Sequence, residues 1–165
     1  MNIINSSGAL ALSTRLQRLA EQLRKDGMLF YKTYGIEFEP KWFPVVFTLS
    51  KRPLMSVIEL AMEIGYSHPS TISLLKELEK EKLISSKKDK KDERKRLLVL
   101  TQKGLELVDT MQPIWKNIES ALSEISSNND NLLRAIDQAE ESLKQQSFLQ
   151  RAMAFKMKEQ GILFC

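Results

Sequence analysis

Two groups of residues in this sequence could bind a partner. The first consists of small donors and acceptors with a lysine one helical turn further on: Ser67, His68, Ser70, Thr71, Ser73 and Lys76. Side chains of this size can approach nucleic-acid base edges and phosphates closely. The second is a charged run over residues 87–96, whose cations could contact phosphates or enter a minor groove. Its candidate contacts are Lys88, Lys90, Lys91, Asp92, Arg94 and Arg96.

The positive charge of the chain is confined to that run. The formal net charge is +4, from 25 Lys and Arg against 21 Asp and Glu. Residues 87–96 alone contain seven basic and three acidic side chains, so the rest of the chain is neutral. Localised charge of this kind favours a phosphate-bearing partner.

Other functional classes receive little support. We find no clustered nucleophile, base or metal-ligand set, so we expect neither an enzyme nor a cofactor or metal site. His68 is the one histidine, and its place beside Pro69 favours capping or nucleic-acid binding over catalysis. The single cysteine, Cys165, excludes an intrachain disulfide, and no signal peptide or membrane span is evident. A cytoplasmic protein is therefore expected.

Helices must position both groups. Leucines at positions 12, 16, 19 and 23 predict a long amphipathic helix from about residue 10 to 34. Residues 41–50 predict a short buried helix or turn around Pro44. Ser56 and Glu59 have capping-box spacing, which predicts a helix that ends at Gly65. A second helix, 67–80, follows with Ser67 as its N-cap.

The charged run lies between two expected strands, 83–85 and 96–100, and is therefore predicted to be a hairpin tip, with a wing over residues 85–97. Thr101 is expected to cap a further helix with a kink at Pro113. A last helix is expected from residue 132, interrupted at Gln146 and Gln150.

Together these elements predict a mainly α fold with a small β-wing: a winged helix-turn-helix flanked by long N- and C-terminal helices. We expect a single domain over residues 1–165, with a DNA-binding lobe at 41–101 and dimerisation helices at 9–35 and 102–160. Helix 67–80 would enter a major groove and the wing a minor groove. An alternative is a helical interaction module whose basic hairpin contacts an acidic protein or RNA.

The segment from Pro53 to Gly104 contains a series of short motifs: Leu60-Ala61, Gly65, Ser70-Thr71-Ile72-Ser73, Leu78-Glu79, Leu83-Ile84, Asp89, Asp92-Glu93-Arg94 and Leu100-Thr101-Gln102-Lys103-Gly104. In this order and register they resemble the core of the MarR family of bacterial transcription regulators. The resemblance implies a homodimer, most often a repressor, bound to a pseudo-palindromic double-stranded operator. It also implies that Arg94 enters the minor groove and that Asp92 orients it.

Two positions depart from the family pattern. Glu93 stands where a second arginine is common, which lowers the local positive charge. Lys82 stands where glycine is usual; if the backbone is left-handed there, lysine costs on the order of 1 kcal/mol.

The remaining resemblances concern ligands and domain context. Residues 12–26 and 38–50 look like the regulator half of MarR proteins fused to a GNAT-type acetyltransferase, and we expect the regulator alone here. Family members bind small aromatic effectors in a crevice, and Tyr31, Tyr34, Trp42 and Phe47 could line one here. Each of these aromatics could equally be a core residue.

Overall fold

The computed structural model describes residues 2–88, 96–127 and 131–159 of the 165-residue chain. It divides into two compact units, Met1–Lys116 and Asn117–Cys165, which are described separately below. None of the helices described is long and apolar enough to cross a membrane.

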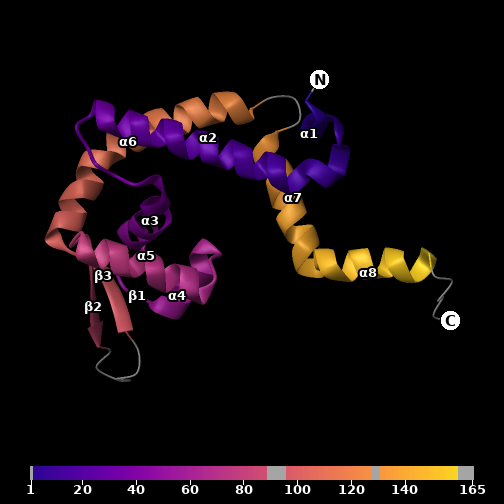
Figure 1. Cartoon of the computed structure of the whole chain (residues 1–165). Helices are drawn as coiled ribbons and strands as arrows, with labels where there is room; N and C mark the ends of the chain where they lie inside the picture. The colour runs from indigo at the N-terminus through magenta and orange to yellow at the C-terminus, as the bar shows by residue number, and fades with distance from the viewer. Residues whose placement is uncertain (1, 89–95, 128–130, 160–165) are drawn as a thin grey trace. The chain divides into compact units, whose positions relative to one another are not determined.

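The first unit begins with the short helix α1 (Ile3–Ser6), a 3-10 turn η1 (Gly8–Ala11) and the long helix α2 (Leu12–Thr33), labelled in Figure 1. Arg18 of α2 donates to the Asn5 side-chain oxygen at 2.7 Å, which ties α1 to α2. The predicted long helix is confirmed. Its leucines are exposed within the single chain, from 61% at Leu12 to 37% at Leu23.

A 3-10 turn η2 (Pro40–Trp42) leads into α3 (Phe43–Lys51), so residues 41–50 are largely helical. Pro44 lies in the first turn, where its missing N–H removes no helical hydrogen bond. Val45, Val46 and Leu49 of this helix are fully or almost fully buried.

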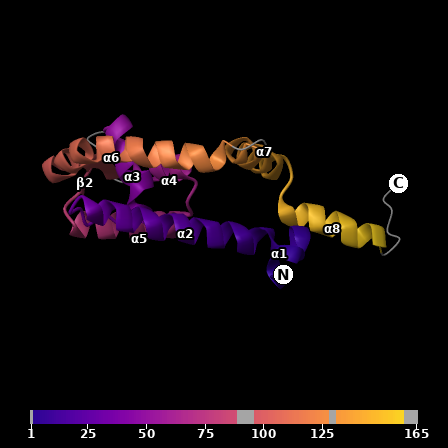
Figure 2. The same cartoon turned by 90° about the horizontal axis from the view of Figure 1, so that it is seen from above.

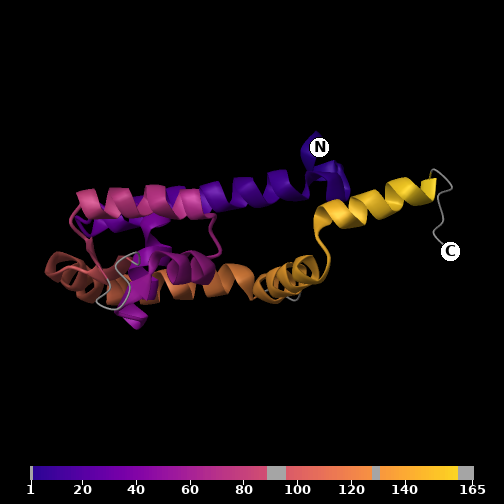
Figure 3. The same ribbon diagram turned by 90° about the horizontal axis from the view of Figure 1, so that it is seen from below.

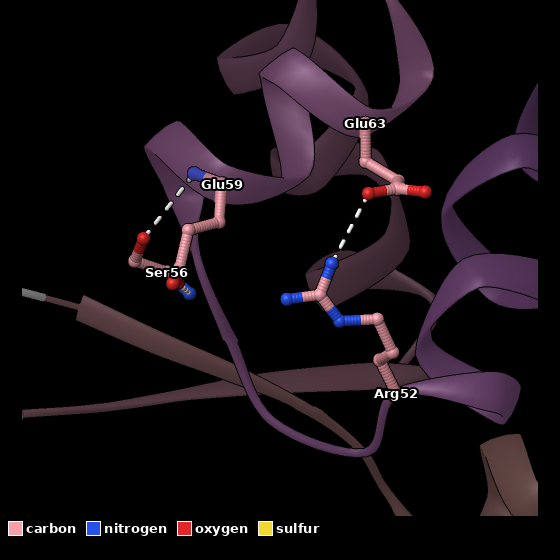
Figure 4. Close-up of polar contacts among 4 residues, drawn as sticks. All are labelled: Arg52, Ser56, Glu59 and Glu63. Carbon is pink, nitrogen blue, oxygen red and sulfur yellow. Dashed lines mark hydrogen bonds and ion pairs between the residues drawn. The ribbon is translucent and has the colours of Figure 1, made fainter.

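Helix α4 (Val57–Ile64) forms the first half of the helix-turn-helix. The Ser56 hydroxyl accepts the Glu59 N–H at 3.2 Å, and the Glu59 carboxylate accepts the Ser56 N–H at 2.7 Å, as Figure 4 shows. This is the predicted capping box. Gly65 ends the helix at a φ of 69°, a left-handed conformation that glycine adopts without strain.

Helix α5 (His68–Lys80) follows and corresponds to the predicted 67–80 helix. Its buried side faces a core shared with α3, α4 and the sheet. The core of this lobe contains Val45, Val46, Leu49, Met55, Leu60, Ala61, Leu74, Leu75, Leu78, Leu83, Ile84 and Leu98.

The sheet has three antiparallel strands in the order β1-β3-β2: β1 (Met55–Ser56), β2 (Ile84–Lys88) and β3 (Arg96–Leu100). Met55 pairs with Leu98, and Ile84 pairs with Leu100 at the other edge of β3. Figure 1 shows β2 and β3 side by side. The hairpin is confirmed, although its first strand lies at 84–88 instead of 83–85; β1 was not predicted, because two residues carry no periodicity.

Helix α6 (Gln102–Ser126) contains Pro113 and runs into the second unit. That unit continues with α7 (Leu132–Gln145) and α8 (Phe148–Glu159), drawn as separate helices in Figures 2 and 3. The last helix, expected with interruptions at Gln146 and Gln150, is two separate helices, because the chain leaves helical geometry at Gln146. Ser147 and Gln150 then form a reciprocal cap, at 2.8 and 3.2 Å, that starts α8.

Candidate nucleic-acid interface

The N-terminal end of α5 presents hydroxyl groups to solvent. The Ser67 hydroxyl accepts the Ser70 N–H at 3.3 Å and lies 2.8 Å from the Ser70 hydroxyl. Ser67, His68, Ser70 and Ser73 are all exposed. A helix N-terminus also carries a partial positive charge, which favours a phosphate nearby.

The outward face continues toward the C-terminal end of α5. Lys76 is exposed one turn beyond Ser73, whereas Leu74, Leu75 and Leu78 are buried on the opposite side. The helix therefore has one apolar side against the lobe and one polar side available to a partner. Five of the six residues predicted around this helix, all but Thr71, lie on accessible surface.

Thr71 is the exception and corrects the sequence-based prediction. Its side chain is completely buried, and its hydroxyl donates to the Ser67 backbone carbonyl at 3.0 Å. The spacing of Thr71 with Leu74, Leu75 and Leu78 is that of a core-facing helical stripe, and this signal was present in the sequence. Thr71 is therefore a packing residue and not part of the exposed face of α5.

Sequence reasoning missed a polar cluster beside α5. The Glu77 carboxylate binds Lys41 Nζ at 2.7 Å and accepts the Trp42 indole N–H at 3.3 Å. Hydrogen bonds from Lys41 and then Trp42 hold the pKa of Glu77 below its ordinary value. A shallow groove of about 300 Å³ lies here, lined by Lys41, Tyr66, Ser70, Ser73, Leu74 and Glu77.

At the base of the wing, Arg96 is already engaged by the protein. Its Nη2 atom lies 3.4 Å from Glu79 Oε1 and donates to the Ser86 hydroxyl. Arg96 thus joins β3 to β2 and to the end of α5. The Lys88 side chain and all of Lys90, Lys91, Asp92 and Arg94 lie outside the described residues.

The Thr101 hydroxyl connects the segment before β2 to the start of α6. Thr101 Oγ1 donates to the Lys82 carbonyl at 2.6 Å and accepts the Gly104 N–H at 3.1 Å. This confirms Thr101 as the cap of α6. Lys82 has a φ of 58°, a left-handed conformation that strains a residue with a β-carbon. At Gly104 a β-carbon would lie 2.2 Å from the Leu83 carbonyl oxygen, so no larger residue fits without a shift.

The four aromatics predicted for an effector crevice fall into separate contacts. Tyr31 and Trp42 each meet Phe38 edge-on, at 5.1 and 5.7 Å between ring centroids. Phe47 packs instead against Phe43 and Trp115, at 5.0 and 5.5 Å. Tyr34 is exposed and contacts Phe30.

Among these aromatics, Tyr31 is buried and Trp115 is partly buried. Burial raises the pKa of the Tyr31 hydroxyl above its ordinary value, and neighbouring Trp115 opposes part of that rise. The Trp115 Nε1 atom is itself buried and makes no hydrogen bond of acceptable geometry within the described part of the chain. Across the same residues, no three His, Cys, Asp or Glu side chains gather as a metal site.

Comparison with known proteins places this geometry in context. Residues 39–95 match the model of the MarR family, a segment that includes η2, both helices of the helix-turn-helix and β2. No curated protein sequence matches the chain at a significant level.

Solved structures resemble the chain over most of its length. The transcriptional repressor CouR, bound to a 23-mer DNA duplex, is 25% identical, with 81% of this chain and 96% of CouR covered at a TM-score of 0.65. The M. tuberculosis transcriptional regulator MosR in complex with DNA is 18% identical, covering 80% and 95% at 0.68. Bordetella bronchiseptica BpsR, whose DNA binding is regulated by 6-hydroxynicotinic acid, is 17% identical, covering 78% and 98% at 0.57.

Proposed function

We propose that this chain is a transcription regulator of the MarR family that binds double-stranded DNA as a homodimer and acts as a repressor. The observation that carries the proposal is the exposed polar face of α5 next to a basic hairpin, within the segment that matches the family model. In the complex, α5 occupies the major groove and the wing the adjacent minor groove.

The contacts divide into two kinds. Ser67, His68, Ser70 and Ser73 read base edges or contact the nearest phosphates, because they surround the exposed N-terminal end of α5. Lys76 contacts a phosphate, which adds affinity without sequence preference.

The wing residues extend these contacts by analogy with the family motif. Arg94 enters the minor groove with Asp92 as its partner, and the cations that surround this pair contact phosphates: Lys88, Lys90, Lys91 and Arg96. Because Arg96 is already held by Glu79 and Ser86, we propose that it supports the wing base more than it contributes to affinity.

Dimerisation is supported by apolar side chains that each unit leaves exposed. On α2, Leu12, Leu16 and Leu19 line a groove of about 600 Å³, which a single chain leaves open. On α7, Leu133, Ile136 and Leu143 are 61%, 36% and 52% exposed on a strongly amphipathic helix. Two copies that cover these faces would read half-sites about 10 base pairs apart.

A small aromatic effector is a subordinate proposal, prompted by the regulation of BpsR by 6-hydroxynicotinic acid. Its site would involve Tyr31, Tyr34, Trp42 and Phe47. Quenching of the fluorescence of Trp42 and Trp115 during titration with aromatic acids tests for such a ligand.

The function itself is tested by selecting bound sequences from random duplex DNA with the unchanged protein. We expect a pseudo-palindromic sequence to be enriched, and its affinity to fall steeply as salt is raised. Arg94→Ala should weaken binding to every duplex. Failure to retain any duplex, together with a monomer in sedimentation, would contradict the proposal.

A further inference from the structure

Glu77 places a carboxylate on the outward face of α5. Glu77 follows Ser70 and Ser73 by seven and four positions, which places it on the same side of the helix, and it lines the same shallow groove. A negative charge on a surface that meets phosphates weakens binding to every DNA sequence.

Among the described residues, the polar partners of the Glu77 carboxylate belong to one short segment. Lys41 and Trp42, its two partners, are consecutive residues of η2, which directly precedes α3. Lys41 and Glu77 are 48% and 41% exposed, and an ion pair so exposed contributes little to stability. The Trp42 indole N–H gives the Glu77 carboxylate a second, directional contact. The two contacts together fix how the Glu77 side chain lies relative to η2.

Trp42 extends this connection into the protein. Its ring meets Phe38 edge-on, Phe38 meets Tyr31 edge-on, and Tyr31 is 4% exposed near the end of α2. We call Tyr31, Phe38 and Trp42 the aromatic path. Through Glu77 it joins the C-terminal end of α2 to the C-terminal part of α5, with contacts within the first unit.

We propose that Glu77 is a positioning residue for DNA recognition: through Lys41 and Trp42 it fixes the orientation of α5 against the aromatic path and α2. This inference rests on the proposed function, since it names the residue that aims the recognition helix. Because α2 also carries the exposed leucine face, the same path connects the pairing of two copies to the angle of α5.

Two simpler roles for Glu77 predict different behaviour. If Glu77 only repelled phosphates, neutral variants would bind all duplexes more tightly and by the same factor. If it only accepted a hydrogen bond from a cytosine amino group, it would determine one base position and would be independent of Trp42. If Glu77 positions α5, its substitution instead changes the DNA sequence preference at several positions of the half-site. Substitution of Trp42 then has the same effect, because both changes remove the same contact.

The experiment compares affinities for the selected duplex and for a scrambled duplex. The variants are Glu77→Leu, Trp42→Phe, their combination, and Glu77→Gln, which keeps an acceptor for the indole N–H. We expect Glu77→Leu to reduce the affinity ratio about 10-fold, the size of one well-read base pair, and Glu77→Gln to reduce it less. The affinity ratio of the combined variant should be no lower than that of Glu77→Leu alone, because both changes break the same contact.

A matched control exists on the same lobe. Glu63 of α4 pairs with Arg52 at 3.1 Å (Figure 4), and the two side chains are 51% and 55% exposed. Glu63→Gln makes the same charge change without touching the aromatic path, so it should leave the affinity ratio unchanged.

A spectroscopic readout separates positioning from general destabilisation. The chain has two tryptophans, so the indole N–H region of a ¹H–¹⁵N spectrum contains two signals, which Trp42→Phe assigns. Glu77→Leu should shift the Trp42 signal and leave the Trp115 signal in place.

The outcomes are distinguishable. Unchanged discrimination in Glu77→Leu, a uniform gain on both duplexes, or additive effects of Glu77→Leu and Trp42→Phe would each overturn the positioning role while the regulator function stands. If the unchanged protein binds neither duplex, the proposed function fails and this inference fails with it.

Discussion

The α-carbon of Gly104 packs directly against the carbonyl oxygen of Leu83, at a distance that leaves no room for a β-carbon. The same carbonyl accepts the Thr101 N–H at 3.0 Å, so the first turn of α6 and the start of the wing share one contact point. Glycine at this position is therefore required by packing, because its backbone is ordinary helix.

We expect Gly104→Ala to lower the free energy of unfolding by about 2–3 kcal/mol, the cost of overpacking a rigid backbone contact. Gly27→Ala is the control, because its β-carbon would meet Pro40 at an ordinary 3.8 Å. That variant should gain up to about 1 kcal/mol from helix propensity. Urea unfolding measures both, and equal effects of the two substitutions would contradict the packing explanation.

At Lys82, next to Leu83 in the chain, we expect glycine to be the more stable residue. At a φ of 58° its β-carbon is strained, so Lys82→Gly should stabilise the protein by roughly 0.5–1 kcal/mol, after allowing for the greater freedom of glycine in the unfolded chain. Lys82→Ala removes the charge but keeps the β-carbon, and should bring little gain. A midpoint of urea unfolding that rises equally in both variants would point to charge and not to backbone strain.

Thr71 and Ser73 are expected to respond differently to substitution. Thr71→Val should cost about 1 kcal/mol of stability through the lost hydrogen bond to Ser67 and leave sequence preference unchanged. Ser73→Ala should leave stability nearly unchanged and alter the preferred duplex. Urea unfolding checks the two stabilities, and selection from random DNA checks the two sequence preferences. A changed preference in Thr71→Val would contradict a purely packing role for Thr71.

Lys76 should contribute affinity without preference. In Lys76→Ala we expect weaker binding to all duplexes and a slope of log affinity against log salt that is smaller by about 1, for one lost phosphate contact. Fluorescence anisotropy at several salt concentrations provides this slope. An unchanged slope would place Lys76 away from the phosphates.

Glu77 should make stability depend on pH. Its pKa is lowered in the folded state, so its pairing is fully present above the unfolded pKa and is lost as pH falls through the folded pKa. The wild-type protein should therefore lose stability relative to Glu77→Gln as pH falls from about 6 to about 3. Urea unfolding of the two proteins across that range measures this difference in the free energy of unfolding. A stability advantage of the wild-type protein that grows as pH falls would contradict the prediction.

Local signals made most of the fold predictable. Ser56 with Glu59, Ser67 and Thr101 each start a helix where a side-chain oxygen can satisfy backbone N–H groups, and these rules act over four residues. Ser147 and Gln150 carry the same signal, so the start of α8 could also be read from the sequence.

The candidate site was less predictable for two physical reasons. Glu77 finds Lys41 and Trp42 only once η2 and α5 have packed, and no local rule joins residues that far apart in sequence. For Thr71 the residue type and the spacing point in opposite directions: a small polar side chain is typical of the surface, but its position continues the buried stripe of Leu74, Leu75 and Leu78.

The pairing of β1 with β3 has a consequence for how the chain folds. The β2–β3 hairpin joins neighbouring segments, whereas Met55 reaches Leu98 only after the whole helix-turn-helix has been brought round between them. Closing that larger loop costs more chain entropy before any contact repays it. The two residues of β1, the shortest strand in the lobe, are therefore expected to be the last to join the sheet and the first to leave it.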